Sequence, residues 1–248
     1  WDLGYRFNNG DIIASAAVWY NEYDNRIVSA FDADPASPFF GQSVDRNVGA
    51  VELMGFDGAV GWQATDRLSL YVSAAYNDSE IKDDLRLGNF NCTSANQRPG
   101  STPACPAAPA PALAIPTFLP TGGKKLVETP EWTFAGRIDF DVTDNFSVGL
   151  QGKYTGERFA TDVNDETFDA FTVLDFDARY DLTRALNIKD AFIQLNVTNI
   201  LDEEYQANIS TGTNALPVAQ STDPRVPDRN GSVRTGSIGA PRTWLVSI

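Results

Sequence analysis

Hydrophobic and polar residues alternate along most of this chain with a period of two, which predicts β-strands. The alternation is clearest in residues 131–141 and 146–155, which are separated by the turn sequence Thr143-Asp144-Asn145. One face of this pair holds aromatic and aliphatic residues, and the other holds charged and polar residues. The pattern therefore predicts an antiparallel hairpin with one apolar face.

Seven further strands are predicted on the same basis. They cover Trp1–Phe7, Asp11 to about Ser29, Met54–Gln63, Leu68–Asn77, Phe168–Tyr180, Ala191–Thr198 and Gly239–Ile248. The sequence Asn8-Asn9-Gly10 favours a tight turn, because asparagine and glycine tolerate the positive φ angles that such turns need. The second strand is much longer than the five or six residues typical of soluble domains. We therefore expect it either to cross another layer or to project beyond the body of the sheet.

Short and long connections alternate along these nine predicted strands. The connections at Asn8, Thr65, Thr143 and Leu182 are short, whereas those at Asp32, Ile81, Gly156 and Asp202 are longer and more polar. An up-and-down meander places all short turns on one rim and all long loops on the other. Outer-membrane β-barrels have this asymmetry.

Aromatic residues near predicted strand ends fit the interface belts of such barrels, although ordinary core packing is an alternative for each one. The residues concerned are Trp62, Phe140, Phe146, Tyr180 and Trp244.

The longest irregular stretch, residues 81–124, holds half of the prolines and both cysteines, Cys92 and Cys105. Its length is typical of a functional loop, and a linker between two domains is the alternative. Two cysteines this close in an exposed loop favour a disulfide formed in an oxidising compartment. Free thiols and a two-ligand metal clip are the alternatives.

Charge and composition exclude several function classes. The net charge of −14 argues against a nucleic-acid partner, since phosphate binding requires clustered Lys and Arg. The chain has no histidine, so serine-histidine triads and ordinary zinc sites lack their central residue. No carboxylate pair stands out among the acidic residues. We therefore expect no enzyme activity, no catalytic residue, no cofactor and no metal site.

A sequence motif near the end of the chain is similar to the C-terminal signature of TonB-dependent outer-membrane receptors. That signature is an Asn-Leu-Phe-Asp-x-x-Tyr-like segment, a surface loop, a Gly-x-x-Arg-like step and a last membrane strand. The matching residues are Asn199, Ile200, Leu201, Asp202 and Tyr205, followed by Gly239 and Arg242.

The resemblance implies an all-β, antiparallel transmembrane barrel in the outer membrane of a Gram-negative bacterium. Members of the family are 22-stranded barrels with a plugged lumen. Residues 1–248 would then be the C-terminal portion of the barrel, about its last nine strands, with 81–124 as a long external loop. The plug domain and the TonB box are not recognisable. No signal peptide is present and residues 1–7 are already a predicted strand, so we expect this sequence to begin inside a fold. The end at Ser247-Ile248 lacks the family's usual terminal aromatic residue, so a few C-terminal residues are expected to be missing.

By the same resemblance, the whole receptor takes up a scarce nutrient, most often a ferric siderophore. Its partners are outer-membrane lipid, that ligand, the plug, the remaining barrel strands, and the TonB complex through the N-terminal part. The sequence does not identify the ligand-binding residues. Arg137 and Lys153, which alternate with apolar residues, are candidates for lining a path for anionic chelates.

Two other functions are compatible with parts of the sequence. A secreted acidic β-sandwich would bind calcium or carbohydrate through the loops Asp162–Glu166 and Asp202–Glu204, because oxygen-rich loops suit calcium. A passive porin-like barrel would share the strand pattern of a receptor.

Overall fold

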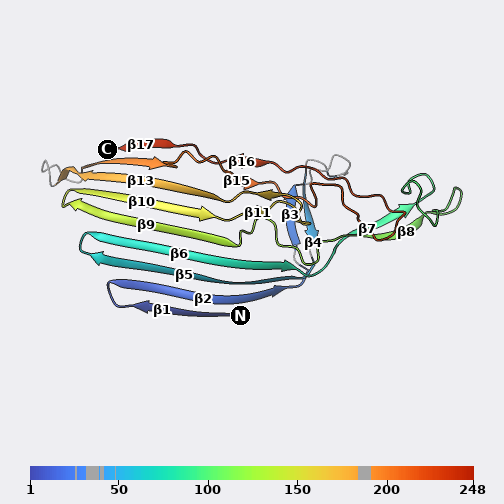
Figure 1. Cartoon of the computed structure of the whole chain (residues 1–248), viewed down its shortest axis with the longest axis horizontal. Helices are drawn as coiled ribbons and strands as arrows, with labels where there is room; N and C mark the ends of the chain where they lie inside the picture. Colours follow the sequence, from blue (N-terminus) through green and yellow to red (C-terminus); the bar gives the residue numbers. More distant parts are fainter. Residues whose placement is uncertain (26, 32–38, 40–41, 48, 184–190) are drawn as a thin grey trace.

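The computed structural model describes residues 1–25, 27–31, 39, 42–47, 49–183 and 191–248. Within these residues the chain forms a nine-stranded antiparallel sheet (Figure 1). Each strand of this sheet pairs with the next in chain order, so the predicted meander is confirmed. The strands are β1 (Asp2–Asn8), β2 (Ile12–Tyr23), β5 (Val51–Thr65), β6 (Leu68–Ile81), β9 (Trp132–Thr143), β10 (Phe146–Thr155), β13 (Phe171–Asp181), β14 (Phe192–Thr198) and β17 (Thr243–Ser247).

Four two-stranded hairpins lie in the long connections, at the end of the sheet opposite the short turns (Figure 1). The hairpin of β7 and β8 projects furthest from the sheet. The pairs are β3 (Ile27–Phe31) with β4 (Ser43–Asn47), β7 (Leu85–Cys92) with β8 (Leu113–Leu119), β11 (Arg158–Phe159) with β12 (Thr167–Phe168), and β15 (Gln206–Ile209) with β16 (Gly236–Ile238).

The strand register gives the large sheet one apolar face and one polar face. Val148 of β10 lies opposite Phe140 and Ala178 on its two neighbours, and the adjacent Gly149 lies opposite Asp139 and Asp177. Because successive side chains point to opposite faces, these two rows belong to different faces. The alternation predicted within each strand thus continues across the sheet.

Aromatic residues gather near both ends of the apolar face. At the loop end, neighbouring rings lie 4.8–5.9 Å apart between centroids. We call this set the outer aromatic band: Phe56, Tyr76, Trp132, Phe134 and Tyr154. None of the five aromatic residues predicted for belts (Trp62, Phe140, Phe146, Tyr180 and Trp244) is buried, so they do not form a closed core within the described residues.

The buried apolar residues lie mostly at the loop end. Most of them form three clusters: Val51, Ile81 and Leu126; Cys92, Cys105, Ile115 and Val226; and Leu85, Leu119 and Val163. The apolar face of the sheet remains exposed, with side chains such as Val72 at 60% and Ile138 at 46%. No helix in the part of the chain that the structure describes is long and apolar enough to span a membrane.

Four sequence predictions need correction. The last strand, expected from Gly239, begins at Thr243, because Ala240 and Arg242 bond residues just after the end of β14 instead. The strand expected to reach Ser29 ends at Tyr23, because Asn25 adopts a left-handed φ of 52° and residues 27–31 pair in a separate hairpin. Residues 81–124 are not irregular throughout, since β7 and β8 pair across them. The strand expected from Phe168 begins at Phe171, because residues 167–168 pair with β11.

Two predicted connections lie largely or partly outside the described residues. They are the loop with Asp32, Asp34, Pro35 and Pro38, and the turn at 181–190, of which 184–190 are not described.

Candidate functional site

Three long connections pack together at the loop end of the sheet, and we call residues 81–131, 156–170 and 199–242 the loop layer. Residues 156–170 lie between the other two. The Asn164 side chain accepts a hydrogen bond from the Lys125 backbone N–H at 2.7 Å and donates one to the Lys125 carbonyl at 3.0 Å. Asn164 has a left-handed φ of 58°, a conformation that asparagine tolerates better than most residues. Asn164 therefore links the first connection to the second.

The second connection is joined to the third by two carboxylates. Asp165 accepts hydrogen bonds from the backbone N–H groups of Ala215 at 2.9 Å and Leu216 at 2.8 Å. Glu166 accepts one from the backbone N–H of Arg234 at 2.9 Å. These acids, which were candidates for calcium binding, are thus occupied by neighbouring backbone. Among the described residues, no group of three or more His, Cys, Asp or Glu is placed to hold a metal.

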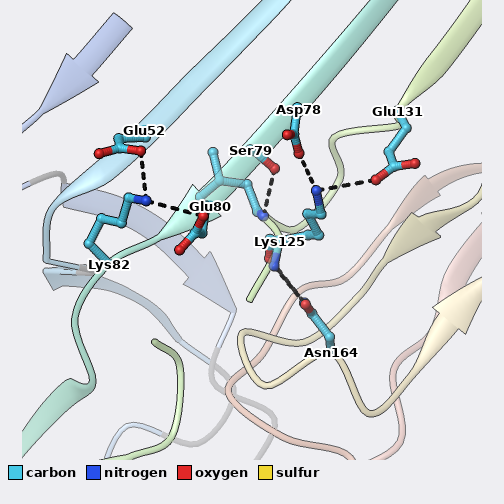
Figure 2. Close-up of polar contacts among 9 residues, drawn as sticks. Glu52, Asp78, Ser79, Glu80, Lys82, Lys125, Glu131 and Asn164 are labelled. Carbon is cyan, nitrogen blue, oxygen red and sulfur yellow. Dashed lines mark hydrogen bonds and ion pairs between the residues drawn. The ribbon is translucent and has the colours of Figure 1, made fainter. Parts of the chain in front are cut away.

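Two lysines anchor the base of the loop layer to the ends of β5 and β6 (Figure 2). Lys82 forms ion pairs with Glu52 at 2.6 Å and Glu80 at 3.1 Å, and these contacts raise its pKa, the bond to Glu52 most strongly. Lys125 contacts Asp78 and lies 3.3 Å from Glu131. Burial lowers the pKa of Lys125, but the bonds to the two carboxylates outweigh burial and raise it overall.

The predicted disulfide between Cys92 and Cys105 is present, with the two Cα atoms 5.7 Å apart. Both cysteines are buried against Ile115 of β8 and Val226 of the last connection. The Phe118 backbone N–H also donates to the Gln220 carbonyl at 2.6 Å. The disulfide therefore stabilises a projecting arm that is made of the β7–β8 hairpin and part of the third connection.

Ion pairs accompany this contact between the hairpin and the third connection. Arg98 in the tip of the hairpin pairs with Asp228. In the same region, hydrogen bonds from the Arg225 side chain and backbone hold the pKa of Asp223 at about 2, below its usual value.

The sequence motif near the end of the chain, which we call the tail motif, forms a junction between the end of β14 and the start of β17. Its residues are Asn199, Ile200, Leu201, Asp202, Tyr205, Gly239 and Arg242. Asn199 is 2% exposed, and its side chain bonds the backbone N–H and C=O of Glu203 and the carbonyl of Ala240, all at 2.9–3.0 Å. Arg242 donates its backbone N–H to Asp202 at 2.9 Å and a side-chain N–H to the Ile200 carbonyl at 3.3 Å. The motif thus closes the last loop.

Tyr205 and Gly239 complete this junction. The Tyr205 ring stacks on Phe171 with centroids 4.4 Å apart. A Cβ atom at Gly239 would lie 2.1 Å from the Tyr205 ring, so only glycine fits there without displacing the ring. Leu201 of the motif is 59% exposed, and we have no structural role for its side chain.

The polar face of the sheet carries the two basic residues singled out in the sequence. Arg137 is held by Asp139 at 2.6 Å and Asp177 at 3.0 Å, so its charge is already balanced. It lies across Gly149, where a Cβ atom would be 2.6 Å from the guanidinium. Lys153 is exposed and borders a shallow cavity of about 290 Å³ with Asp57 and Ser73. The structure does not bring Arg137 and Lys153 into one cationic path.

A cavity of about 510 Å³ lies beside the tail motif. Its size is that of a small-molecule site. Its lining is Thr167, Phe168, Asp169, Ala170, Phe171, Glu203, Glu204, Tyr205, Gln206 and Ile238. Sequence reasoning missed this cavity because its walls come from three separate segments. The acidic pair Glu203-Glu204 was the only signal in the sequence. Two adjacent glutamates in a polar loop suggested exposed loop surface and not a cavity.

Comparisons with known proteins agree with this architecture. The sequence model of the family "TonB dependent receptor-like, beta-barrel" matches residues 1–200. The ferrioxamine receptor of Yersinia enterocolitica is 29% identical over 197 residues, which cover 78% of this chain and 21% of that receptor. The chain therefore spans about a fifth of the length of this curated relative.

Solved structures share the fold. The ferric yersiniabactin uptake receptor FyuA from Yersinia pestis superposes with a TM-score of 0.63 at 13% identity, covering 99% of this chain and 28% of that one. The siderophore receptor PiuA from Acinetobacter baumannii gives a TM-score of 0.57 at 18% identity, covering 98% and 27%.

Proposed function

This chain belongs to the family of TonB-dependent receptor-like β-barrels, and from that premise we propose that residues 1–248 are the C-terminal portion of the barrel of an outer-membrane receptor for a ferric siderophore or similar chelate. The family is one of receptors and transporters rather than enzymes. The observation that carries the proposal is the sheet itself, which has an apolar face, a polar face and every long connection at one end.

The two faces and two ends of the sheet correspond to the surroundings of such a barrel. The exposed apolar face suits lipid, and the charged face that holds Arg137 suits a polar lumen. The short turns then lie on the periplasmic side and the loop layer outside the cell. This orientation places the cavity beside Glu203 and Tyr205 on the external side, where a ligand arrives.

The two unpaired edges of the sheet indicate that further strands are needed to complete a barrel. β1 and β17 lie at the two ends of the strand order, and an unpaired strand edge is not stable within a membrane. An all-antiparallel sheet with an odd number of strands also cannot close on itself without one parallel pair. We therefore propose that other strands complete a 22-stranded barrel around a plug.

The names of the relatives guide the choice of ligand class. One is a ferrioxamine receptor, and another is a ferric yersiniabactin uptake receptor. In this proposal the ligand binds at the external loops, and the TonB complex supplies energy through the N-terminal part. Outer-membrane lipid, the plug and the ligand are the expected partners in a Gram-negative bacterium.

The topology argues against one alternative function. A secreted β-sandwich would require two packed sheets, whereas the nine long strands of this chain form a single meander. The passive porin remains distinguishable by experiment.

Uptake of radioactive iron tests the receptor proposal. Cells that express the intact receptor are expected to accumulate iron supplied as a hydroxamate chelate, and dissipating the proton gradient is expected to stop that accumulation. Energy-independent accumulation would instead indicate a porin. A receptor that purifies as a stable monomer without detergent would contradict both barrel functions.

A further inference from the structure

A groove of about 260 Å³ lies where the loop layer meets the apolar face of the sheet. We call it the rim groove. It is lined by Lys125, Thr129, Glu131, Trp132, Tyr154, Gly156, Glu157 and Phe159.

The groove is continuous with the apolar face. Trp132 and Tyr154 belong to the same face as Ile138 and Leu150, since they are separated from them by even numbers of residues along β9 and β10. Both rings are part of the outer aromatic band, through contacts of Trp132 with Tyr76 and Phe134 and of Phe134 with Tyr154. In the proposed receptor, the groove therefore opens toward the outer leaflet at the level of the lipid headgroups.

Backbone contacts fix the shape of the groove. Gly156 donates its N–H to the Trp132 carbonyl at 2.9 Å, and a Cβ atom at position 156 would lie 2.9 Å from that oxygen. Lys125, which also lines the groove, is held by Asp78 and Glu131 (Figure 2). The walls are thus held in place before any ligand binds.

The charges of the groove select against a phosphate group. Its one cation, Lys125, is already paired with two carboxylates, whereas Glu157 makes no ion pair with any residue that the structure describes. A phosphate would be repelled by the excess negative charge, but hydroxyl groups would donate hydrogen bonds to Glu157 and Glu131. The rings of Trp132, Tyr154 and Phe159 offer apolar surfaces for the C–H groups of a sugar.

We propose that the rim groove binds the uncharged, hydroxyl-rich headgroup of an outer-leaflet glycolipid, whose acyl chains lie along the outer aromatic band. The inference rests on the proposed function, because it requires the apolar face to contact lipid. It adds a specific lipid site to the general lipid contact of a barrel.

Native mass spectrometry of the intact receptor in detergent tests this site. The probes are a glucosyl diacylglycerol and a phosphatidic acid with the same acyl chains. The glycolipid is expected to bind at least about tenfold more tightly, and Glu157→Ala is expected to remove about that advantage through loss of a charged hydrogen-bond acceptor. Glu22→Ala is the matched control, because Glu22 is an exposed glutamate on β2 outside the groove.

Two results would overturn the proposal. Equal retention of both lipids would show only nonspecific contact with the apolar face, and tighter retention of phosphatidic acid would show a phosphate site. Either result leaves the receptor function standing if the protein still requires detergent and takes up iron. A protein that is stable without detergent would instead refute the receptor function on which the site depends.

Discussion

Asn199 acts through hydrogen bonds that only asparagine can make at its position. Its φ of 51° is left-handed, a conformation that asparagine tolerates better than most residues. Its amide group both accepts a hydrogen bond and donates two, to backbone groups on either side of the last loop. The family motif at this position is therefore explained by the closure of the loop and needs no contact with ligand.

Replacement of Asn199 is expected to weaken this junction. Asn199→Ala leaves the Ala240 and Glu203 carbonyls and the Glu203 N–H without partners, which should destabilise the fold by about 2 kcal/mol. Calorimetry of the detergent-solubilised receptor should show a lower unfolding temperature. Asn208→Ala, at an exposed position of β15, serves as the control. An unchanged unfolding temperature for Asn199→Ala would contradict the role of the junction.

Asp223 gives a pH-dependent contact. Its pKa is lowered to about 2 by hydrogen bonds from the Arg225 side chain and backbone. Because the folded pKa lies below the unfolded value, this contact stabilises the turn fully above about pH 4 and is lost as the pH falls toward 2. The protection factor of the Arg225 amide in hydrogen exchange should fall over that range.

The control for this pH effect is Asp223→Asn, which keeps an oxygen acceptor but does not titrate. Its amide protection should stay constant as the pH falls. A parallel fall in both proteins would show that some other group controls the turn.

At the scale of elements, the connection at 156–170 determines how the loop layer is assembled. It bonds the first connection through Asn164 and the third through Asp165 and Glu166. The alternation of apolar and polar residues could not predict this, because these contacts join side chains to backbone groups that are far away in the sequence. The strands, by contrast, followed from local alternation, and their order followed from the lengths of the connections.

Loss of the Asn164 side chain should separate the first two connections. Asn164→Ala is expected to increase hydrogen exchange at the Lys125 amide by about tenfold, because that N–H loses its acceptor. The strands β9 and β10 should retain their protection. Asn89→Ala, an exposed asparagine of β7, is the matched control. Unaltered exchange at Lys125 would show that other contacts hold the two connections together.

At the scale of the whole molecule, the stable core and the proposed membrane surface are separate. The three buried clusters lie mostly at the loop end, whereas the central part of the sheet has an exposed apolar face. A protein built in this way is expected to require lipid or detergent around the sheet. The loop layer should be more rigid than loops without a core, because it has its own buried residues.

Deletion of Asn89–Pro120 tests the role of the projecting arm. The deletion removes the disulfide and the Phe118 N–H that donates to the Gln220 carbonyl, so ligand uptake should be abolished while heat-resistant barrel assembly is kept. A smaller change, Cys92→Ser with Cys105→Ser, should weaken uptake less, because the backbone pairing of β7 with β8 remains. Normal uptake after the deletion would exclude the arm from the binding site.

The sequence by itself determined the nine long strands of the main sheet, their two faces, the asymmetry of the connections and the family, because each depends on local periodicity, loop length or a short motif. The disulfide was also accessible, since its cysteines are close in sequence and lie in one loop. Only the tertiary structure decided that Asp162–Glu166 joins neighbouring loops instead of forming an open acidic site, that Arg137 is neutralised by Asp139 and Asp177, and that the rim groove exists. These features depend on which distant backbone and side-chain groups meet, and hydrogen bonding and charge pairing between such groups leave no periodic signal in the chain.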